Sequence, residues 1–208
     1  MATTSVTRIT ETPHGEARVH LHPAADPRGA LVLGHGAGGG VEAPDLIAAT
    51  AAAGAQGFSV ALVEQPYRVA GKRSSPAAKQ LDAVWIAVAE DLMASDFAGL
   101  RLVAGGRSAG ARVACRTAEA TGAAAVLCLA FPLQPPARAG KEPSPSRLPE
   151  LDAVTVPMLI VQGESDRFGM PEPGPNREVV QVKGDHSLRS DREAVSIAVA
   201  KWLQKLDW

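Results

Sequence analysis

The chain has 208 residues, a length that suits one domain and allows a core to be buried without disulfide or metal support. Its formal net charge of -1 gives no electrostatic basis for binding nucleic acid or an anionic membrane, so we expect neither partner. The N-terminal segment lacks the apolar core of a signal peptide, and no stretch reaches the about 18 apolar residues of a membrane span, which predicts a soluble, cytoplasmic protein. Cys115 and Cys128 lie in apolar segments and are expected to be buried as small hydrophobic side chains.

The first part of the chain predicts a hairpin followed by a strand, a helix and a strand. Residues 5–12 and 16–22 flank the turn signal PHG and predict an antiparallel hairpin. The short apolar runs at 29–34 and 58–64 are typical of strands buried on both faces of a sheet. Between them, residues 43–57 predict a helix with a proline near its start and a glycine at its end.

The middle of the chain predicts a loop, a helix, a strand and a second helix. Residues 66–76 are expected to form a basic loop. In the next helix, apolar residues recur at helical spacing: Leu81, Val84, Trp85, Val88 and Leu92. This stripe predicts that Trp85 packs in the core. A buried strand at 100–106 then leads directly into a helix over 108–122.

The last part of the chain predicts three more strands, at 124–131, 156–164 and 177–183. The segment 132–149 is rich in proline and basic residues and predicts a loop too short to form a separate lid domain. A closing amphipathic helix is predicted over 190–206, with Ser190 as its N-cap and Glu193 completing a capping box.

The order of the predicted elements indicates the fold class. Strands alternate with helices through the body of the chain, which is typical of βαβ units and of a mostly parallel central sheet with helices on both faces. The N-terminal hairpin adds antiparallel strands to this α/β arrangement. Because the sequence contains no internal repeat and no linker, we expect residues 1–208 to form a single domain without a lid.

A G-x-S-x-G pattern from Gly106 to Gly110 lies where the predicted strand turns directly into a helix. In that context Ser108 would occupy a strained turn with its hydroxyl exposed, and small residues on either side would let strand and helix pack closely. The helix N-terminus would favour negative charge that develops there. Ser108 is therefore a candidate nucleophile, while a capping serine in a glycine-rich turn is the structural alternative.

A serine nucleophile needs a histidine base and an acid that orients the histidine. Three of the five histidines lie in the N-terminal hairpin, where the segment HLHP has no third metal ligand nearby, so no metal site is expected. His35 belongs to a glycine-rich loop. His186, between the last predicted strand and the last helix, is the remaining candidate base.

The orienting acid is expected between Ser108 and His186 in the chain. Asp166 follows a predicted strand and fits this position. Glu164 is a competitor that lies two residues early, at the strand end, and Asp185 adjoins the histidine and is poorly placed to reach its ring. The serine, the aspartate and the histidine each follow a successive strand, which favours their acting together.

The segment LVLGHGAGGG, residues 31–40, fits two functions. Gly34, Gly36 and Gly39 match the dinucleotide-binding pattern G-x-G-x-x-G, and Glu64 at the end of the next strand could bind a ribose. The same segment matches the His-Gly loop that supplies an oxyanion hole in many hydrolases. We favour the oxyanion interpretation because dinucleotide binding leaves the serine, aspartate and histidine motifs unexplained.

These motifs resemble the α/β-hydrolase superfamily over nearly the whole chain, through the hairpin, GHGAGGG, GGRSAG, GESD and GDHSL. The likeness is closest to the small lidless group that includes dienelactone-hydrolase-like enzymes, and FPLQPP and VQGESDRFG also resemble predicted hydrolases related to testis-expressed and NSL-complex subunit proteins. The resemblance implies Ser108 as nucleophile, His186 as general base and then acid, and Asp166 as the orienting carboxylate. It also implies an oxyanion hole made by the backbone amides of Ala37 and Ala109.

The function expected from these motifs is a serine hydrolase that needs no cofactor and cleaves an ester, thioester or lactone of a small soluble substrate. A catalytically silent binding or scaffold protein and a dinucleotide-binding oxidoreductase are the alternatives. Ligands of open parallel sheets bind at the carboxyl ends of the strands, where the substrate-pocket candidates lie: His35, Gly36, Gly38, Tyr67, Arg68, Arg107, Pro132 and Phe168.

Two further expectations concern these loops. We expect His35 to brace its loop through hydrogen bonds rather than to catalyse. The basic residues of the loops would form a positive rim for a carboxylate or phosphate, or would be solvated surface charges: Arg68, Lys72, Arg73, Arg107, Arg138, Lys141 and Arg167.

Overall fold

A computed structural model of the chain describes residues 5–136, 140, 142 and 144–208. Its strands are β1 (Val6–Thr12), β2 (Gly15–His22), β3 (Gly29–Gly34), β4 (Phe58–Glu64), β5 (Leu102–Arg107), β6 (Ala125–Leu129), β7 (Met158–Gly163) and β8 (Arg177–Val182). Its helices are α1 (Pro44–Ala55), α2 (Pro66–Val69), α3 (Ala78–Ala94), α4 (Ala109–Thr117), α5 (Leu148–Asp152) and α6 (Arg192–Gln204).

The described strands form one continuous sheet in the order β1-β2-β4-β3-β5-β6-β7-β8. From β4 to β8 every neighbouring pair is parallel, whereas β2 joins β4, and β1 joins β2, in antiparallel orientation. Both the parallel body and the N-terminal hairpin of the predicted α/β fold are therefore confirmed. The central strands β3, β5 and β6 are buried almost throughout, as their apolar runs indicate.

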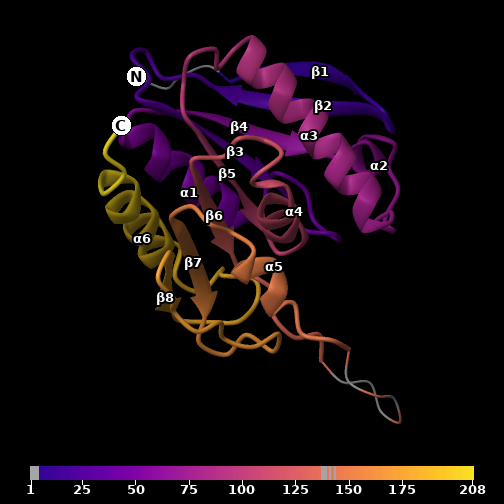
Figure 1. Cartoon of the computed structure of the whole chain (residues 1–208), viewed down its shortest axis with the longest axis vertical. Helices are drawn as coiled ribbons and strands as arrows, with labels where there is room; N and C mark the ends of the chain where they lie inside the picture. The colour runs from indigo at the N-terminus through magenta and orange to yellow at the C-terminus, as the bar shows by residue number, and fades with distance from the viewer. Residues whose placement is uncertain (1–4, 137–139, 141, 143) are drawn as a thin grey trace.

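Helices cover both faces of the sheet, with α1 and α6 on one face and α3 and α4 on the other (Figure 1). Trp85 is 1% exposed and belongs to the core on the α3 side, as predicted, while Phe58 and Trp202 belong to the core beneath α1 and α6. Cys115 and Cys128 are free and buried, which also confirms the prediction. Within the described ranges, no helix combines the length and the apolar character needed to cross a membrane.

Two predicted loops contain short helices. The segment 66–76 begins with α2, because Pro66 sets the first helical turn and the Gln65 carbonyl accepts from the N–H groups of Arg68 and Val69. The segment 132–149 runs into α5, which buries Leu151. Single helical turns leave no apolar periodicity in the sequence, so their prediction as loops was wrong.

The N-cap predicted for the last helix is also wrong by one residue. The cap of α6 is Asp191, whose Oδ1 accepts from the backbone N–H of Ala194 at 3.0 Å. Ser190 instead packs against Gly184, where an added Cβ would lie 2.7 Å from the serine Oγ. Both residues are good caps, and the tertiary contact of Ser190 decides between them.

Candidate active site

Ser108 lies in the sharp turn that joins β5 to α4, with φ 52° and ψ -106°. A positive φ is unfavourable for a residue with a Cβ, so this turn is held in place by its surroundings. The glycines on either side of Ser108 allow the neighbouring segments to approach the turn closely. A Cβ on Gly106 would lie 2.6 Å from the Gly34 carbonyl oxygen, and a Cβ on Gly110 would overlap the same carbonyl group. The G-x-S-x-G spacing is therefore required by the close contact of α4 with the ends of β3 and β5.

His186 connects Ser108 to Asp166 through its two ring nitrogens. Its Nε2 lies 2.9 Å from the Ser108 Oγ, and its Nδ1 lies 2.8 Å from the Asp166 Oδ2. The carboxylate accepts, so Nδ1 carries a proton, and in a neutral ring Nε2 is then free to accept the serine proton. The Asp166 side chain is fully buried, whereas that of His186 is 19% exposed. The three side chains predicted to act together are thus in contact.

Asp166 is held by further donors that sequence reasoning missed. The Gln162 Nε2 donates to the Asp166 Oδ2 at 2.9 Å, and the Phe168 N–H donates to Oδ1 at 2.9 Å. Gln162 is fully buried in β7, four residues before Asp166. In the sequence it looks like an ordinary strand residue. The competing acids do not reach the histidine ring: Glu164 is exposed, and Asp185 accepts from Ser187.

His35 braces the glycine loop, as predicted. Its Nδ1 donates to the Gly36 carbonyl at 2.8 Å, and its Nε2 accepts from the Gln65 N–H at 3.1 Å. The ring is therefore neutral, and burial lowers the pKa of His35, which favours that state. Tyr67 adds a second brace, because its hydroxyl donates to the Ala37 carbonyl at 3.0 Å. Both side chains thus support the loop in which the sequence predicts an oxyanion donor.

The backbone N–H groups of Ala37 and Ala109 make no hydrogen bond within the described part of the chain. Ala109 is the first residue of α4 and directly follows Ser108, so its N–H belongs to the unsatisfied first turn of that helix. Both N–H groups are therefore free to donate to a bound group, which an oxyanion hole requires of its donors.

Arg107, the residue before Ser108, joins three segments of the site. Its Nε donates to the Asp45 Oδ2 at 3.1 Å, and its Nη2 donates to the His186 carbonyl at 3.2 Å. An added Cβ on Gly36 would lie 2.7 Å from the Arg107 Nη1, so glycine leaves room there for the guanidinium. Asp45 is fully buried at the start of α1, and this burial raises the pKa of Asp45 against the opposing effect of Arg107.

The structure does not bring the other pocket candidates together in one place. Gly38, Arg68 and Arg107 line a cavity of about 710 Å³. Tyr67 lines a second cavity of about 690 Å³. The Phe168 ring packs against the His186 ring, with 4.4 Å between centroids. Pro132 is buried, and its carbonyl accepts from the Arg147 Nη1 at 2.9 Å.

The basic residues predicted to form a positive rim lie only partly together in the structure. Of its members, Arg68 and Arg107 share the 710 Å³ cavity, whereas Lys72 lines the second cavity and Arg167 lies over the Phe168 ring. Arg73 is exposed. Two further members, Arg138 and Lys141, lie outside the described residues.

The residues invoked for other activities have structural partners. Glu64, the candidate ribose ligand, accepts from Arg18 at 3.0 Å and lies 3.5 Å from the His20 Nε2. In the part of the chain that the structure describes, no group of three or more His, Cys, Asp or Glu side chains is arranged to hold a metal ion.

Comparison with known proteins identifies the family. The sequence pattern of the alpha/beta hydrolase domain family matches residues 27–199, which include every strand after the hairpin. The chain belongs to the α/β-hydrolase family. Family membership confirms the predicted resemblance to the α/β-hydrolase superfamily. No curated protein sequence matches the chain.

Solved structures of other α/β hydrolases share the fold. XC6422 from Xanthomonas campestris, described as a serine hydrolase without a lid, is 19% identical with a TM-score of 0.72, covering 97% of this chain and 96% of that chain. Est1E from Butyrivibrio proteoclasticus is 15% identical with a TM-score of 0.74, covering 95% and 97%. Dienelactone hydrolase from Anabaena variabilis is 13% identical with a TM-score of 0.76, covering 98% of each chain. This α/β hydrolase therefore shares its fold with these proteins over 95–98% of its length.

Proposed function

We propose that this α/β hydrolase is a serine hydrolase that cleaves an ester, thioester or lactone bond of a small soluble substrate through an acyl-enzyme on Ser108. The observation that carries the proposal is the pair of hydrogen bonds that joins the Ser108 hydroxyl to His186 and His186 to the buried Asp166. A serine hydroxyl is a weak nucleophile unless a base takes its proton, and His186 is the base within reach.

In the first half of the proposed reaction, the Ser108 Oγ bonds to the substrate carbonyl carbon while its proton passes to the His186 Nε2. The carbonyl π electrons move to the oxygen, which the N–H groups of Ala37 and Ala109 stabilise. The intermediate then collapses, the bond to the leaving group breaks, and the leaving group takes the proton from Nε2. Asp166 stays ionised and keeps the imidazole ring in the productive orientation.

In the second half, water attacks the acyl-enzyme. Its proton passes to the His186 Nε2 as its oxygen bonds to the acyl carbon, and a second tetrahedral intermediate forms. Collapse of this intermediate breaks the bond to the Ser108 Oγ, which recovers the proton from Nε2 as the carboxylic acid leaves. No cofactor takes part in these steps. A cytoplasmic location remains a prediction of the sequence.

The test is covalent labelling by a fluorescent fluorophosphonate, which reacts with an activated serine. We expect the wild type to be labelled, the Ser108→Ala variant not to be labelled, and the His186→Ala variant to be labelled far more slowly. Loss of either residue should reduce the hydrolysis of a short ester by about 10⁴-fold or more, because these groups act as a unit.

The matched control is Ser95→Ala, which removes a serine hydroxyl at the end of α3, outside the proposed machinery. Circular dichroism would establish that each variant is folded. If the folded wild type is not labelled, the scaffold alternative replaces the hydrolase proposal, and NAD binding to the glycine loop becomes the next measurement. Labelling that persists in Ser108→Ala would place the nucleophile elsewhere.

A further inference from the structure

A cavity of about 710 Å³ lies beside the glycine loop, where it adjoins the proposed catalytic residues. Its wall includes Arg107, which precedes Ser108, and Ser187, which follows His186. The opposite parts of the wall come from β2, from the end of β4 and from the segment 38–45, which leads into α1. A substrate held at Ser108 could therefore extend into this cavity.

Four arginines line the cavity, and two of them are already neutralised by carboxylates. Arg18 pairs with Glu64 at 3.0 Å, and Arg107 pairs with Asp45 at 3.1 Å. These pairs fix the shape of the wall and contribute little net charge to it.

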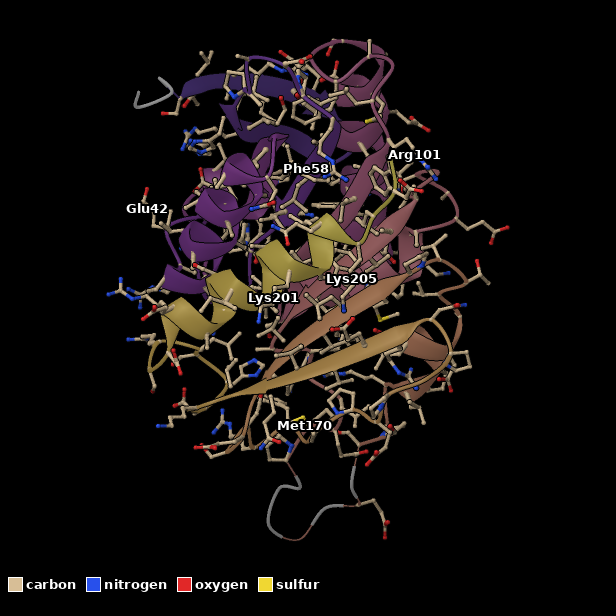
Figure 2. All side chains as sticks on the ribbon, turned by 90° about the vertical axis from the view of Figure 1, so that its left-hand side faces the viewer. Glu42, Phe58, Arg101, Met170, Lys201 and Lys205 are labelled. Atoms are coloured by element: carbon tan, nitrogen blue, oxygen red, sulfur yellow. The ribbon has the colours of Figure 1, made fainter. Side chains whose placement is uncertain are left out.

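The other two arginines, Arg68 and Arg189, have no carboxylate within salt-bridge distance in the part of the chain that the structure describes. The Nε of Arg68 is buried without a hydrogen-bond partner among the same residues, and its Nη1 donates only to the Lys72 carbonyl, at 3.3 Å. The remaining carboxylate of the wall, Glu42, is exposed and lies at the outer edge of the molecule (Figure 2). Arg189 is exposed as well, so the part-buried Arg68 is the arginine that brings uncompensated positive charge into the cavity.

The glycine loop provides further donors on the same wall. A Cβ added to Gly38, Gly39 or Gly40 would meet no atom within 4 Å, so the backbone at these positions faces open space. Within the described ranges, the N–H groups of Gly38 and Gly40 make no hydrogen bond. Free N–H groups in a glycine-rich turn are a common setting for anion binding in proteins.

We propose that this cavity binds a carboxylate or phosphate group carried by the substrate, with Arg68 and Arg189 as its charged contacts and the glycine loop as its backbone donor. The proposal rests on the proposed serine hydrolase function and specifies its substrate class. Guanidinium groups suit this role because they present several donors in a planar fork that matches a carboxylate or phosphate. A neutral substrate would leave both arginines without a partner.

The catalytic test compares matched esters at constant ionic strength, since salt screens such contacts. We would measure kcat/KM for para-nitrophenyl hydrogen adipate against its neutral methyl ester, and for an ester ending in a phosphate against its neutral dimethyl phosphate. The wild type should prefer the anionic member of at least one pair. Arg68→Gln and Arg189→Gln should each reduce that preference by about tenfold, because each lowers kcat/KM for the anionic ester more than for its neutral partner.

The matched control is Arg192→Gln, which removes the same charge from an exposed arginine on α6 outside the cavity wall. It should keep the preference of the wild type. Equal loss of preference in the control would mean that net charge alone sets selectivity, and it would overturn the proposal.

A second measurement separates this proposal from the proposed hydrolysis. Titration calorimetry on the Ser108→Ala variant would measure binding of monomethyl adipate and of inorganic phosphate, with and without the Arg68→Gln change. Binding that Arg68→Gln weakens supports the anion site even if the wild type hydrolyses no ester. Hydrolysis without anion preference, together with no measurable binding of either anion, would overturn the site and leave the hydrolase function standing. Comparing the binding of monomethyl adipate with that of inorganic phosphate identifies whether the cavity accepts a carboxylate or a phosphate.

Discussion

The buried ion pair of Arg107 with Asp45 is the least expected contact at the residue scale. Arg107 directly precedes the proposed nucleophile in the chain, and its guanidinium donates both to Asp45 and to the carbonyl of His186. The pKa of Asp45 is raised by burial, so the folded chain binds a proton at this carboxyl more readily than the unfolded chain does. Ionisation of Asp45 therefore lowers the free energy of unfolding. We infer that the functional value of this aspartate is that its carboxylate anchors Arg107.

Replacing Asp45 by asparagine should separate stability from activity. Below the unfolded pKa of 3.8 both states are protonated, so the wild type and Asp45→Asn should be similarly stable. As the pH rises from that value through the raised folded pKa, the wild type alone loses stability, and Asp45→Asn should become the more stable protein. Its kcat should nevertheless fall by about tenfold or more, since Arg107 loses its anchor.

Urea unfolding at pH 4 and pH 7, together with ester hydrolysis, would measure both effects. Glu119→Gln, at an exposed carboxylate outside the cavity wall, is the control and should change neither quantity appreciably. A variant with unchanged kcat would show that the ion pair does not position the site. A stability difference that shrinks as the pH rises would contradict the stated direction of the Asp45 pKa.

At the scale of elements, the position of α4 depends on glycine at its second residue. Gly110 packs against the end of β3 so closely that any side chain would overlap the Gly34 carbonyl. Alanine at this position should destabilise the fold by about 1–3 kcal/mol, as overpacking does, and should displace Ser108 from His186. The measurement is the free energy of unfolding from urea titration, with fluorophosphonate labelling as the second readout.

The matched control is the helical glycine of α1. Gly54 has no atom within 4 Å of an added Cβ, so Gly54→Ala should gain about 0.5–1 kcal/mol from helix propensity. If Gly110→Ala lowers the free energy of unfolding while Gly54→Ala raises it, the loss is due to the contact of Gly110 with β3 and not to replacing a helical glycine. A change of the same sign in both variants would contradict the close packing of α4 on the sheet.

The long elements were predictable because their residues carry the signal locally. The apolar runs of β3 and β4 coincide with the predicted strands at both ends, and the stripe around Trp85 locates α3. The short helices α2 and α5 were missed since a single turn has no period to detect. Gln162 and Asp45 were missed because their roles depend on contacts with residues distant in the chain, Phe131 and Arg107. The serine, aspartate and histidine were found through their motifs and their order along the strands.

At the scale of the whole molecule, one sheet separates two apolar cores that share its strands. We propose that the chain is a single domain whose two cores unfold together, because neither helical layer can bury its apolar face without the sheet. Trp85 reports on one core and Trp202 on the other. Trp208 packs against Phe58 of β4 and beneath Arg101, so this residue also contacts the sheet. Figure 2 labels Phe58 and Arg101.

This proposal predicts coincident unfolding transitions. Two variants each keep the tryptophans of one core: Trp85→Phe keeps Trp202 and Trp208, and the double variant Trp202→Phe/Trp208→Phe keeps Trp85. Urea titration of each should give one transition by tryptophan fluorescence, at the midpoint that far-ultraviolet circular dichroism gives for the same variant. Distinct midpoints for the two cores would divide the molecule into separately folding parts.

The distribution of the proposed catalytic groups along the chain has a consequence for synthesis. The serine turn follows β5, while His186 follows β8, the last strand of the sheet. A ribosome therefore completes the nucleophile turn long before the base has emerged from the exit tunnel. In the proposed mechanism, a nascent or truncated chain that lacks His186 holds the serine without its proton acceptor. In that mechanism, Ser108 therefore becomes an activated nucleophile only after β8 has joined the sheet and His186 has reached the serine turn.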